Sequence, residues 1–387
     1  MDKKIVAICA VLLFGVSFYA TQSLVSVSTG TQSLPTQENI EVAQPSVGKD
    51  TIKTQFSGPK TEECPINGEK LTKEERLVWE KRRPLVVMIE NHIDARPQSG
   101  LSQADVIYEV VAEGGITRFA SVFYCKDAPL IGPVRSARVY FIDYAGEYGQ
   151  QPLYAHVGGA NTPGPADALG KLRTLNWAGN NDLNQFSIPF PYFFRDYERL
   201  PNRATEHTMY SSTKKLWDFA REKRNLGNTD KKGSSWDKSF VKWKFKDDES
   251  SSDPSAIDIS FGFWDNKSDY SVGWKYQLKE NNYVRYHSDA PHIDKNTNKP
   301  LIAKNVVVLF VRESPANDGY PGGHRLYKTT GSGKGVVFQD GAAVDISWSK
   351  KDTLSRTVLT TKQSRELKFN RGKIWIEIVP EGNEISY

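Results

Sequence analysis

The sequence lacks the short motifs that mark many enzyme families. It contains no H-E-x-x-H, no G-x-S-x-G, no paired C-x-x-C, no Walker A sequence and no dinucleotide-binding fingerprint. The enzyme classes that depend on those motifs are therefore excluded, and we predict no cofactor and no metal site. Whether the chain is an enzyme of another kind stays open at this point.

Charge of one sign is not concentrated anywhere either. The chain has 51 Lys and Arg against 46 Asp and Glu, which gives a net charge of +5 spread along its length. So mild an excess does not require a nucleic-acid partner, and none is predicted. Hydrophobic residues make up 38% of the chain and include 9 Trp, 17 Tyr and 18 Phe, which is enough to build folded cores and excludes disorder throughout.

Cysteine is scarce, with three residues in 387. Cys9 lies inside an apolar run near the N-terminus, which leaves Cys64 and Cys125. These two are enough for one disulfide in an oxidising compartment. Two free, buried thiols are the alternative, and the sequence does not decide between them.

The N-terminus reads MDKK and continues with an apolar run from Ile5 to Ala20. As a helix this run would be about 24 Å long, between the core of a secretory signal and a full membrane span. We predict a signal anchor or a signal peptide over residues 1–24, with the bulk of the chain outside the cytoplasmic membrane. Residues 25–62 are rich in Ser, Thr, Gln and Pro and are predicted to form a disordered stalk.

Residues 63–225 are predicted to form an α/β layered domain, because strand-like and helix-like patterns alternate there. The expected strands are Pro84–Glu90, Ala104–Ala112, Thr117–Tyr124 and Pro152–Val157, with a turn at Gly114-Gly115. The expected helices are Thr72–Lys81, Ser136–Tyr148, Pro165–Leu172 and Thr208–Lys223.

Residues 226–256 are polar and are predicted to be a linker or an insertion, and residues 257–387 a β-rich (α+β) C-terminal domain. Two hairpins are expected in it: Val336–Gln339 with Ala342–Trp348 around Asp340-Gly341, and Leu367–Phe369 with Lys373–Val379. The segment 331–335 (GSGKG) resembles a phosphate-binding loop only superficially, and we expect a glycine-rich turn there.

Polar side chains gather near the ends of the strands expected in residues 63–225. We take these as candidate ligand-binding residues: Glu90, Asn91, Arg96, Glu109, Glu113, Arg118, Arg135, Ser136, Arg138, His156 and His207. Buried ions need partners, so the acids and arginines must either pair with each other or line a wet cleft. An internal ion-pair network, an anion- or glycan-binding cleft and an acid/base catalytic cleft are all consistent with this pattern. For His207, a packing or capping role competes with a role as general base.

Four long stretches of the sequence resemble those of a known family. They are RPLVVMIENHIDARPQSGLSQADVIYEVVAEGGITRFASVFY, IGPVRSARVYFIDYAGEYG, HRLYKTTGSGKGVVFQDG and LKFNRGKIWIEIVP. Together they resemble the YerB-like lipoprotein family of bacteria, a family of unknown function with an N- and a C-terminal domain. The resemblance implies export and attachment to a membrane. Because Cys9 sits within the apolar run, an uncleaved helix is favoured here over a lipid anchor.

We therefore expect a membrane-tethered extracytoplasmic envelope protein that binds an anionic or carbohydrate ligand. Arg118, Arg135 and Arg138 would contact the anion. Glu90, Glu109 and Glu113 would orient these arginines or accept hydrogen bonds from sugar hydroxyls. One alternative is a hydrolase or phosphotransferase acting on envelope glycans, with Glu90 or Glu113 as the acid/base. A second is a protein-interaction scaffold without a small ligand. The expected partners are the membrane and an envelope polymer or protein.

Overall fold

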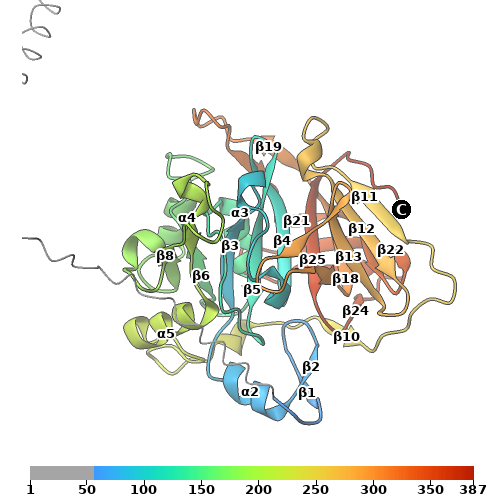
Figure 1. Ribbon diagram of the computed structural model, residues 1–387, viewed down its shortest axis with the longest axis horizontal. Coiled ribbons are helices and arrows are strands. Elements are labelled where there is room, and N and C mark those ends of the chain that lie inside the picture. Colours follow the sequence, from blue (N-terminus) through green and yellow to red (C-terminus); the bar gives the residue numbers. More distant parts are fainter. Residues whose placement is uncertain (1–55) are drawn as a thin grey trace, which may run out of the picture. The chain divides into compact units, whose positions relative to one another are not determined.

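A ten-stranded mixed sheet passes through both predicted domains (Figure 1). The computed structural model describes residues 56–387, so the predicted membrane segment and residues 25–55 of the predicted stalk lie outside the described residues. The strands follow one another in the order β23 (Val358–Thr361), β22 (Ala342–Lys350), β21 (Gly331–Gln339), β18 (Asn305–Val311), β25 (Ile374–Pro380), β4 (Val106–Glu113), β5 (Ile116–Phe123), β3 (Leu85–Glu90), β6 (Leu153–His156) and β7 (Asp182–Asn184).

The strand β25 joins the two halves of this sheet. It pairs in parallel with β18 on one side and with β4 on the other. Five strands come from the part of the chain before residue 226 and five from the part after residue 256, and all of them lie in one compact unit. A strand of the C-terminal region therefore completes the N-terminal region's side of the sheet.

A smaller sheet covers one face of the larger one. Its strands are β11 (Asp258–Phe261), β12 (Val272–Gln277), β13 (Asn282–His287), β14 (Ala290–Pro291) and β17 (Ile302–Ala303). Trp274 of β12 meets Trp375 of β25 edge to face, with ring centroids 5.2 Å apart, and both side chains are fully buried. Large aromatic side chains bury much apolar surface, so this contact is a main anchor between the sheets.

Helices cover the opposite face. The described chain contains four α-helices: α2 (Lys73–Trp79), α3 (Val139–Ala145), α4 (Ala168–Thr174) and α5 (Thr213–Arg224). Tyr144 of α3 stacks on Tyr108 of β4 at 4.8 Å, whereas the next residue, Glu109, contacts Arg285 of the smaller sheet. Successive strand residues point to opposite faces, so β4 is clamped between a helical layer and a β layer. Among residues 56–387, no helix combines the length and apolar character needed to cross a membrane.

Short two-stranded ladders complete the fold. They are β1 (Glu62–Glu63) with β2 (Lys70–Leu71), β8 (Phe194–Arg195) with β9 (Met209–Tyr210), β10 (Lys244–Lys246) with β24 (Lys368–Asn370), β15 (Ile293–Asp294) with β16 (Lys299–Pro300), and β19 (Glu313–Pro315) with β20 (Arg325–Tyr327). The strand β10 lies inside the polar segment 226–256, where Trp236 and Trp243 are also buried. That segment therefore packs onto the fold at several points.

Several expected elements are confirmed. The helix expected at Thr72–Lys81 forms as α2, and Thr72 and Glu75 make a reciprocal capping box at its start. The hairpin around Asp340-Gly341 forms from β21 and β22, with Gln339 opposite Ala342. The helix expected at Ser136–Tyr148 is shorter, because Ala137 is held in a bridge to Gly159 and the helix begins only at Val139.

Two expectations about turns are wrong. The glycine-rich segment 331–335 is the first half of β21, paired along its length with β22, so it is a strand and not a turn. Gly335 is required there by space, because a Cβ would lie 2.4 Å from the backbone oxygen of Val308. The strands β24 and β25 do not form a hairpin with each other, since β24 pairs with β10 and β25 enters the large sheet.

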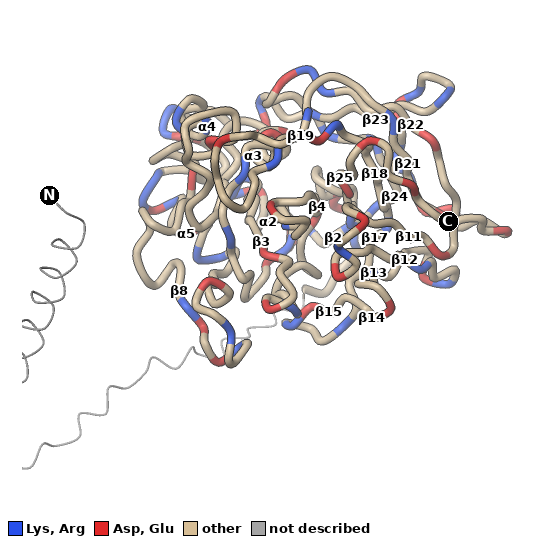
Figure 2. The backbone as a smooth tube through the Cα atoms, turned by 90° about the horizontal axis from the view of Figure 1, so that it is seen from above, with Lys and Arg blue, Asp and Glu red and all other residues tan. Residues whose placement is uncertain are grey.

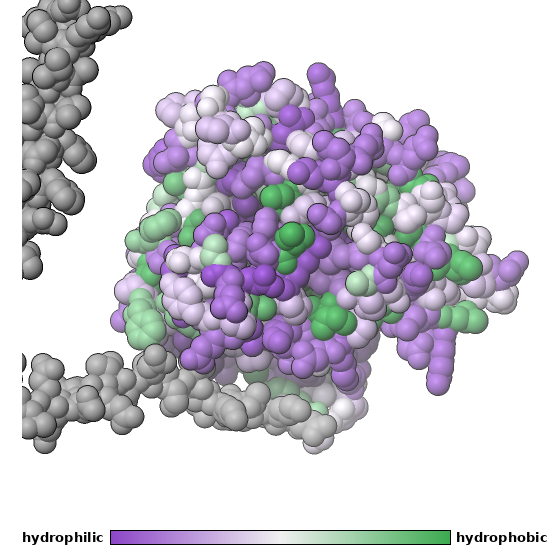
Figure 3. Space-filling model, turned by 45° about the horizontal axis from the view of Figure 1, so that its top comes forward, coloured by the Kyte–Doolittle hydropathy of each residue, from purple (hydrophilic) through white to green (hydrophobic). Residues whose placement is uncertain are grey.

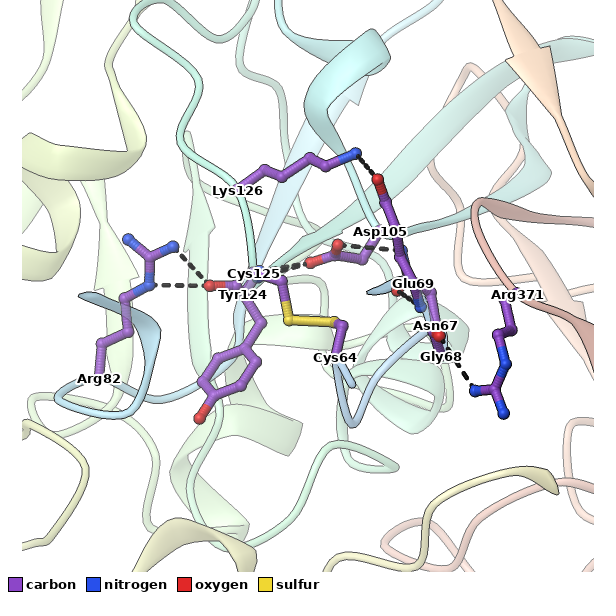
Figure 4. Close-up of a disulfide and its surroundings, with 10 residues drawn as sticks. All are labelled: Cys64, Asn67, Gly68, Glu69, Arg82, Asp105, Tyr124, Cys125, Lys126 and Arg371. Carbon is purple, nitrogen blue, oxygen red and sulfur yellow. Dashed lines mark hydrogen bonds and ion pairs between the residues drawn. A yellow bond between two sulfur atoms is a disulfide. The ribbon is translucent and has the colours of Figure 1, made fainter. Parts of the chain in front are cut away.

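Of the two alternatives that the sequence left open for the cysteines, the structure contains the disulfide. Cys64 and Cys125 are bonded, with Cα atoms 6.0 Å apart, and the bond ties the segment before α2 to the end of β5 (Figure 4). Beside it, the carboxylate of Asp105 accepts hydrogen bonds from the backbone N–H groups of Tyr124 and Cys125 at 2.7 and 3.0 Å.

The surface is polar and mixed in charge. Basic and acidic residues are interspersed along the described chain (Figure 2), in keeping with the small net charge. The face seen in Figure 3 is mostly hydrophilic, with hydrophobic side chains in separate small patches. Such a surface suits contact with water and with polar ligands.

Candidate functional site

The candidate residues gather near one end of the central strands, but they fall into separate groups. The first group is an ion trio of Glu113, Arg118 and Arg138. Arg118 Nη2 and Arg138 Nε lie 3.1 and 3.0 Å from the Glu113 carboxylate oxygens. Burial alone would raise the pKa of Glu113, but the two guanidinium groups outweigh it and lower the pKa to about 2. The arginines are only 4% and 5% exposed, so both are committed to this carboxylate.

The second group lies around Glu109 between the two sheets, and its members are fully buried except for the partly exposed Arg96. The Glu109 carboxylate accepts hydrogen bonds from Thr117 Oγ1 at 2.7 Å and from Asn91 Nδ2 at 3.3 Å, and it pairs with Arg285. Arg96 donates to the Asn91 side-chain oxygen at 3.1 Å. These side chains therefore stabilise the interior instead of facing a ligand.

A second glutamate from the C-terminal region belongs to this buried group. Glu377 of β25 lies directly opposite Glu109 of β4 in the parallel ladder. Burial, reinforced by the negative charge of Glu109, raises the pKa of Glu377 well above its usual value. Burial therefore favours the protonated form of Glu377, and Arg285 pairs with the Glu109 carboxylate.

Glu109 and Glu113 would share one face of a regular strand, because they are four residues apart. The register of β4 against β5 shifts between Val111 and Glu113, however, which marks a β-bulge. Glu109 then contacts the smaller sheet and Glu113 contacts Arg138, which precedes α3. The bulge thus separates two acids that sequence spacing alone would place together.

The third group consists of Glu90, Arg135 and His207. The two carboxylate oxygens of Glu90 lie 2.9 Å from Arg135 Nε and 2.9 Å from His207 Nδ1. The hydrogen bond with Glu90 raises the pKa of His207. The ring of His92 stacks on that of His207, with centroids 4.9 Å apart.

A cavity of about 590 Å³ opens beside this third group. It is lined by Arg135, Ser136, Val157, Gly158, Gly159, Asn161, Leu169, Asn184, Phe186, Arg195, Glu206 and Met209. Of the predicted residues, Arg135 and Ser136 line it directly. His156 is fully buried behind it, 2.6 Å from the Gly158 carbonyl oxygen and 2.6 Å from Asp182, and so supports one wall.

Sequence reasoning missed most of the cavity wall. Arg195, Phe186 and Asn184 come from the loop-rich segment after β6, where no regular spacing marks them. Asn184 Oδ1 accepts from the N–H groups of Gly158 and Phe186, each at 3.2 Å, and thereby fixes the wall of the cavity. The only local signal was Gly158-Gly159, because Gly158 has a φ of +58°, which favours glycine.

The cavity offers groups for an anion and for a sugar. Arg135 is 27% exposed at its side chain, and Arg195 contributes a second guanidinium from β8. The side chain of Phe186 is 77% exposed at the rim. The pKa of Glu206 is lowered, chiefly by a hydrogen bond from its own backbone, so this lining carboxylate is ionised at neutral pH.

The comparisons with known proteins place this architecture in a two-part family without an assigned activity. Residues 68–227 match the model described as "Protein of unknown function (DUF3048) N-terminal domain", and residues 259–376 match the corresponding C-terminal domain. The chain belongs to the DUF3048 family, as the sequence resemblance implied.

Its relatives include a protein of Bacillus subtilis (strain 168) named "Putative lipoprotein YerB". The two are 28% identical over 319 residues, which cover 82% of this chain and 86% of the relative. A crystal structure of the YerB protein from Bacillus subtilis superposes with a TM-score of 0.67 at 26% identity, covering 84% of this chain and all of that one. The fold is thus shared with a solved member of the family.

Proposed function

We propose that this protein is held at the outer side of the bacterial cytoplasmic membrane and binds an anionic envelope carbohydrate in the cavity at Arg135 and Arg195. The observation that carries the proposal is that two arginines from segments about 60 residues apart in the sequence line one open cavity. Guanidinium groups match carboxylates and phosphates through paired hydrogen bonds.

The remaining wall supports the carbohydrate part of the proposal. The amides of Asn161 and Asn184 suit sugar hydroxyls, and the exposed ring of Phe186 offers a flat apolar surface. A volume of about 590 Å³ lies within the ordinary range for small-ligand sites. A cavity of this size would hold a few sugar units of a polymer at a time.

The location rests on three separate supports. The disulfide between Cys64 and Cys125 suits an oxidising compartment outside the cytoplasm. A relative covering most of the chain is named "Putative lipoprotein YerB". The apolar run Ile5–Ala20 is the predicted means of export, as a signal anchor or a signal peptide.

The enzymatic alternative has weaker support. Glycan cleavage needs a carboxylic acid that keeps its proton near neutral pH. Glu206, the acid lining the cavity, has a lowered pKa, and Glu90 is engaged by Arg135 and His207. We therefore favour binding over hydrolysis.

Retention of the purified chain on immobilised wall polymers tests this function. A phosphodiester-linked polymer and a uronic-acid polymer serve as anionic probes and a neutral glucan as the reference. The double variant R135A/R195A should bind the anionic probe at least tenfold more weakly, because each charge-assisted hydrogen bond contributes about 1.5–3 kcal/mol.

The matched control is R365A, which removes an exposed arginine far from the cavity in sequence and should leave binding unchanged. Equal losses in R365A and R135A/R195A would mean that retention is only non-specific attraction. Release of shortened polymer during the incubation would instead favour the enzyme, and absence of retention would favour the scaffold.

A further inference from the structure

His92, Asp94 and His207 form a compact cluster next to the cavity. His92 and Asp94 follow β3 directly, and His207 comes from a short turn more than 100 residues later. One possible ligand atom from each of the three lies within 4.8 Å of those of the other two. His92 Nδ1 and Asp94 Oδ2 are 3.7 Å apart.

His207 is oriented as metal-binding histidines usually are. Its Nδ1 lies 2.9 Å from Glu90 Oε2, and since a carboxylate only accepts, Nδ1 carries the proton. The lone pair of a neutral ring is then on Nε2, which makes no hydrogen bond to any other residue between 56 and 387. His207 is only 5% exposed. Arg135 forms an ion pair with Glu90 and so keeps its carboxylate in place. A carboxylate behind a histidine fixes the ring for a metal ion.

The other two ligands can move to complete the site. The side chains of His92 and Asp94 are 30% and 46% exposed. A tetrahedral ion with bonds of about 2.0–2.1 Å needs its ligand atoms about 3.4 Å apart. The 3.7 Å between His92 and Asp94 is already near that value. Because the rings of His92 and His207 are stacked at 16° to each other, the exposed His92 ring must turn out of the stack to bind the same ion. Binding would also replace the 3.2 Å hydrogen bond from the Asp94 N–H to His92 and the exposed Asp94–Arg203 ion pair, and exposed pairs contribute little.

We propose that His92, Asp94 and His207 bind one divalent transition-metal ion of the zinc class. Two imidazoles and one carboxylate suit zinc, cobalt or nickel and do not suit magnesium or calcium, which prefer oxygen ligands. Three protein ligands leave one position for solvent or a ligand atom. This departs from the sequence prediction of no metal site, which had no local pattern linking His207 to the other two residues. The proposal is independent of the polymer-binding function.

Isothermal titration of the full-length chain, purified without a histidine tag, tests the proposal. Zn²⁺ and Co²⁺ are expected to bind with one ion per chain, whereas Mg²⁺ and Ca²⁺ are not. The variants H92A and D94N should each weaken Zn²⁺ binding at least tenfold. D345N, which removes a carboxylate of similar exposure, should leave it unchanged.

A second readout guards against misfolded variants. Co²⁺ in a site with two nitrogen ligands and one oxygen ligand gives visible absorption bands, and H92A should abolish them while the melting temperature without metal stays the same. Binding weaker than about 100 µM would overturn the proposal. Zn²⁺ affinity and Co²⁺ bands that survive in both H92A and D94N would overturn it too. Because polymer retention is measured separately, a failed metal titration leaves the polymer-binding function to be judged by its own experiment.

Discussion

Removal of the Cys64–Cys125 disulfide is expected to destabilise the fold without abolishing it. The two residues are 61 positions apart, and the chain-entropy relation for a loop of that length gives about 4 kcal/mol. The segment around Cys64 stays attached through other contacts. Among them are Lys126 with Glu69 at 2.6 Å and Arg371 with the Gly68 carbonyl oxygen at 3.2 Å (Figure 4). The native structure should therefore persist in the variant C64S/C125S.

The expected change in melting temperature follows from the size of the fold. A unit of roughly 330 residues has an unfolding entropy of about 0.7 kcal/mol per kelvin, so a loss of 4 kcal/mol lowers the melting temperature by about 6 °C. Circular dichroism melts of oxidised wild type, reduced wild type and C64S/C125S measure this shift, and the last two should agree. The reasoning would be refuted if oxidised wild type and C64S/C125S melted within 1 °C of each other, or if the unfolded, unreduced wild type had titratable thiols at positions 64 and 125.

Three further predictions concern the charged groups and the shared sheet. The pKa of Glu113 is about 2 in the folded protein against an ordinary 4.5, so its ionised form adds at most about 3 kcal/mol to the free energy of unfolding. This contribution is complete above about pH 4.5 and is lost as the pH falls toward 2. The urea midpoint of E113Q should therefore depend less on acid pH than that of the wild type. R285M should cost about 3–5 kcal/mol in urea unfolding, because it leaves the Glu109 carboxylate buried without its cation, and E109Q/R285M should recover part of that loss. Residues 56–225 and 257–387 produced separately should show no cooperative thermal transition, because β4 and β25 each lose a neighbour; a sharp melt of either fragment near that of the intact chain would contradict this.

Local patterns predicted many of the elements. The apolar run ending in Glu90 forms β3, and the segment Thr72–Lys81 contains the expected helix α2, because both patterns act over a few residues. The pairing of β25 with β4 was not predictable in this way, since it joins segments more than 250 residues apart. The turns expected at residues 331–335 and between Phe369 and Lys373 were wrong for the same reason. The strands β21 and β24 pair with β22 and β10, and nearby glycines do not reveal such pairing.

The candidate site was predictable only in part. Arginines and acids near strand ends were recognised, and Arg135 does line a cavity. The sequence did not show that Arg118 and Arg138 are almost completely buried and paired with Glu113, so that they have little surface to offer a ligand. The residues that complete the wall, such as Arg195 in the two-residue strand β8, lie in short elements and loops whose positions depend on the finished fold.

The place of β25 also bears on how the protein is made. The ribosome synthesises the chain from its N-terminus, so β4 is complete long before residues 374–380 have been added. Until then the nascent protein carries an open strand edge in what will become the middle of a sheet, and such edges invite pairing with other chains. A premature stop codon near the end of the message would thus expose the centre of the molecule. We expect the open edge of β4 to need protection from other chains until residues 374–380 have been made.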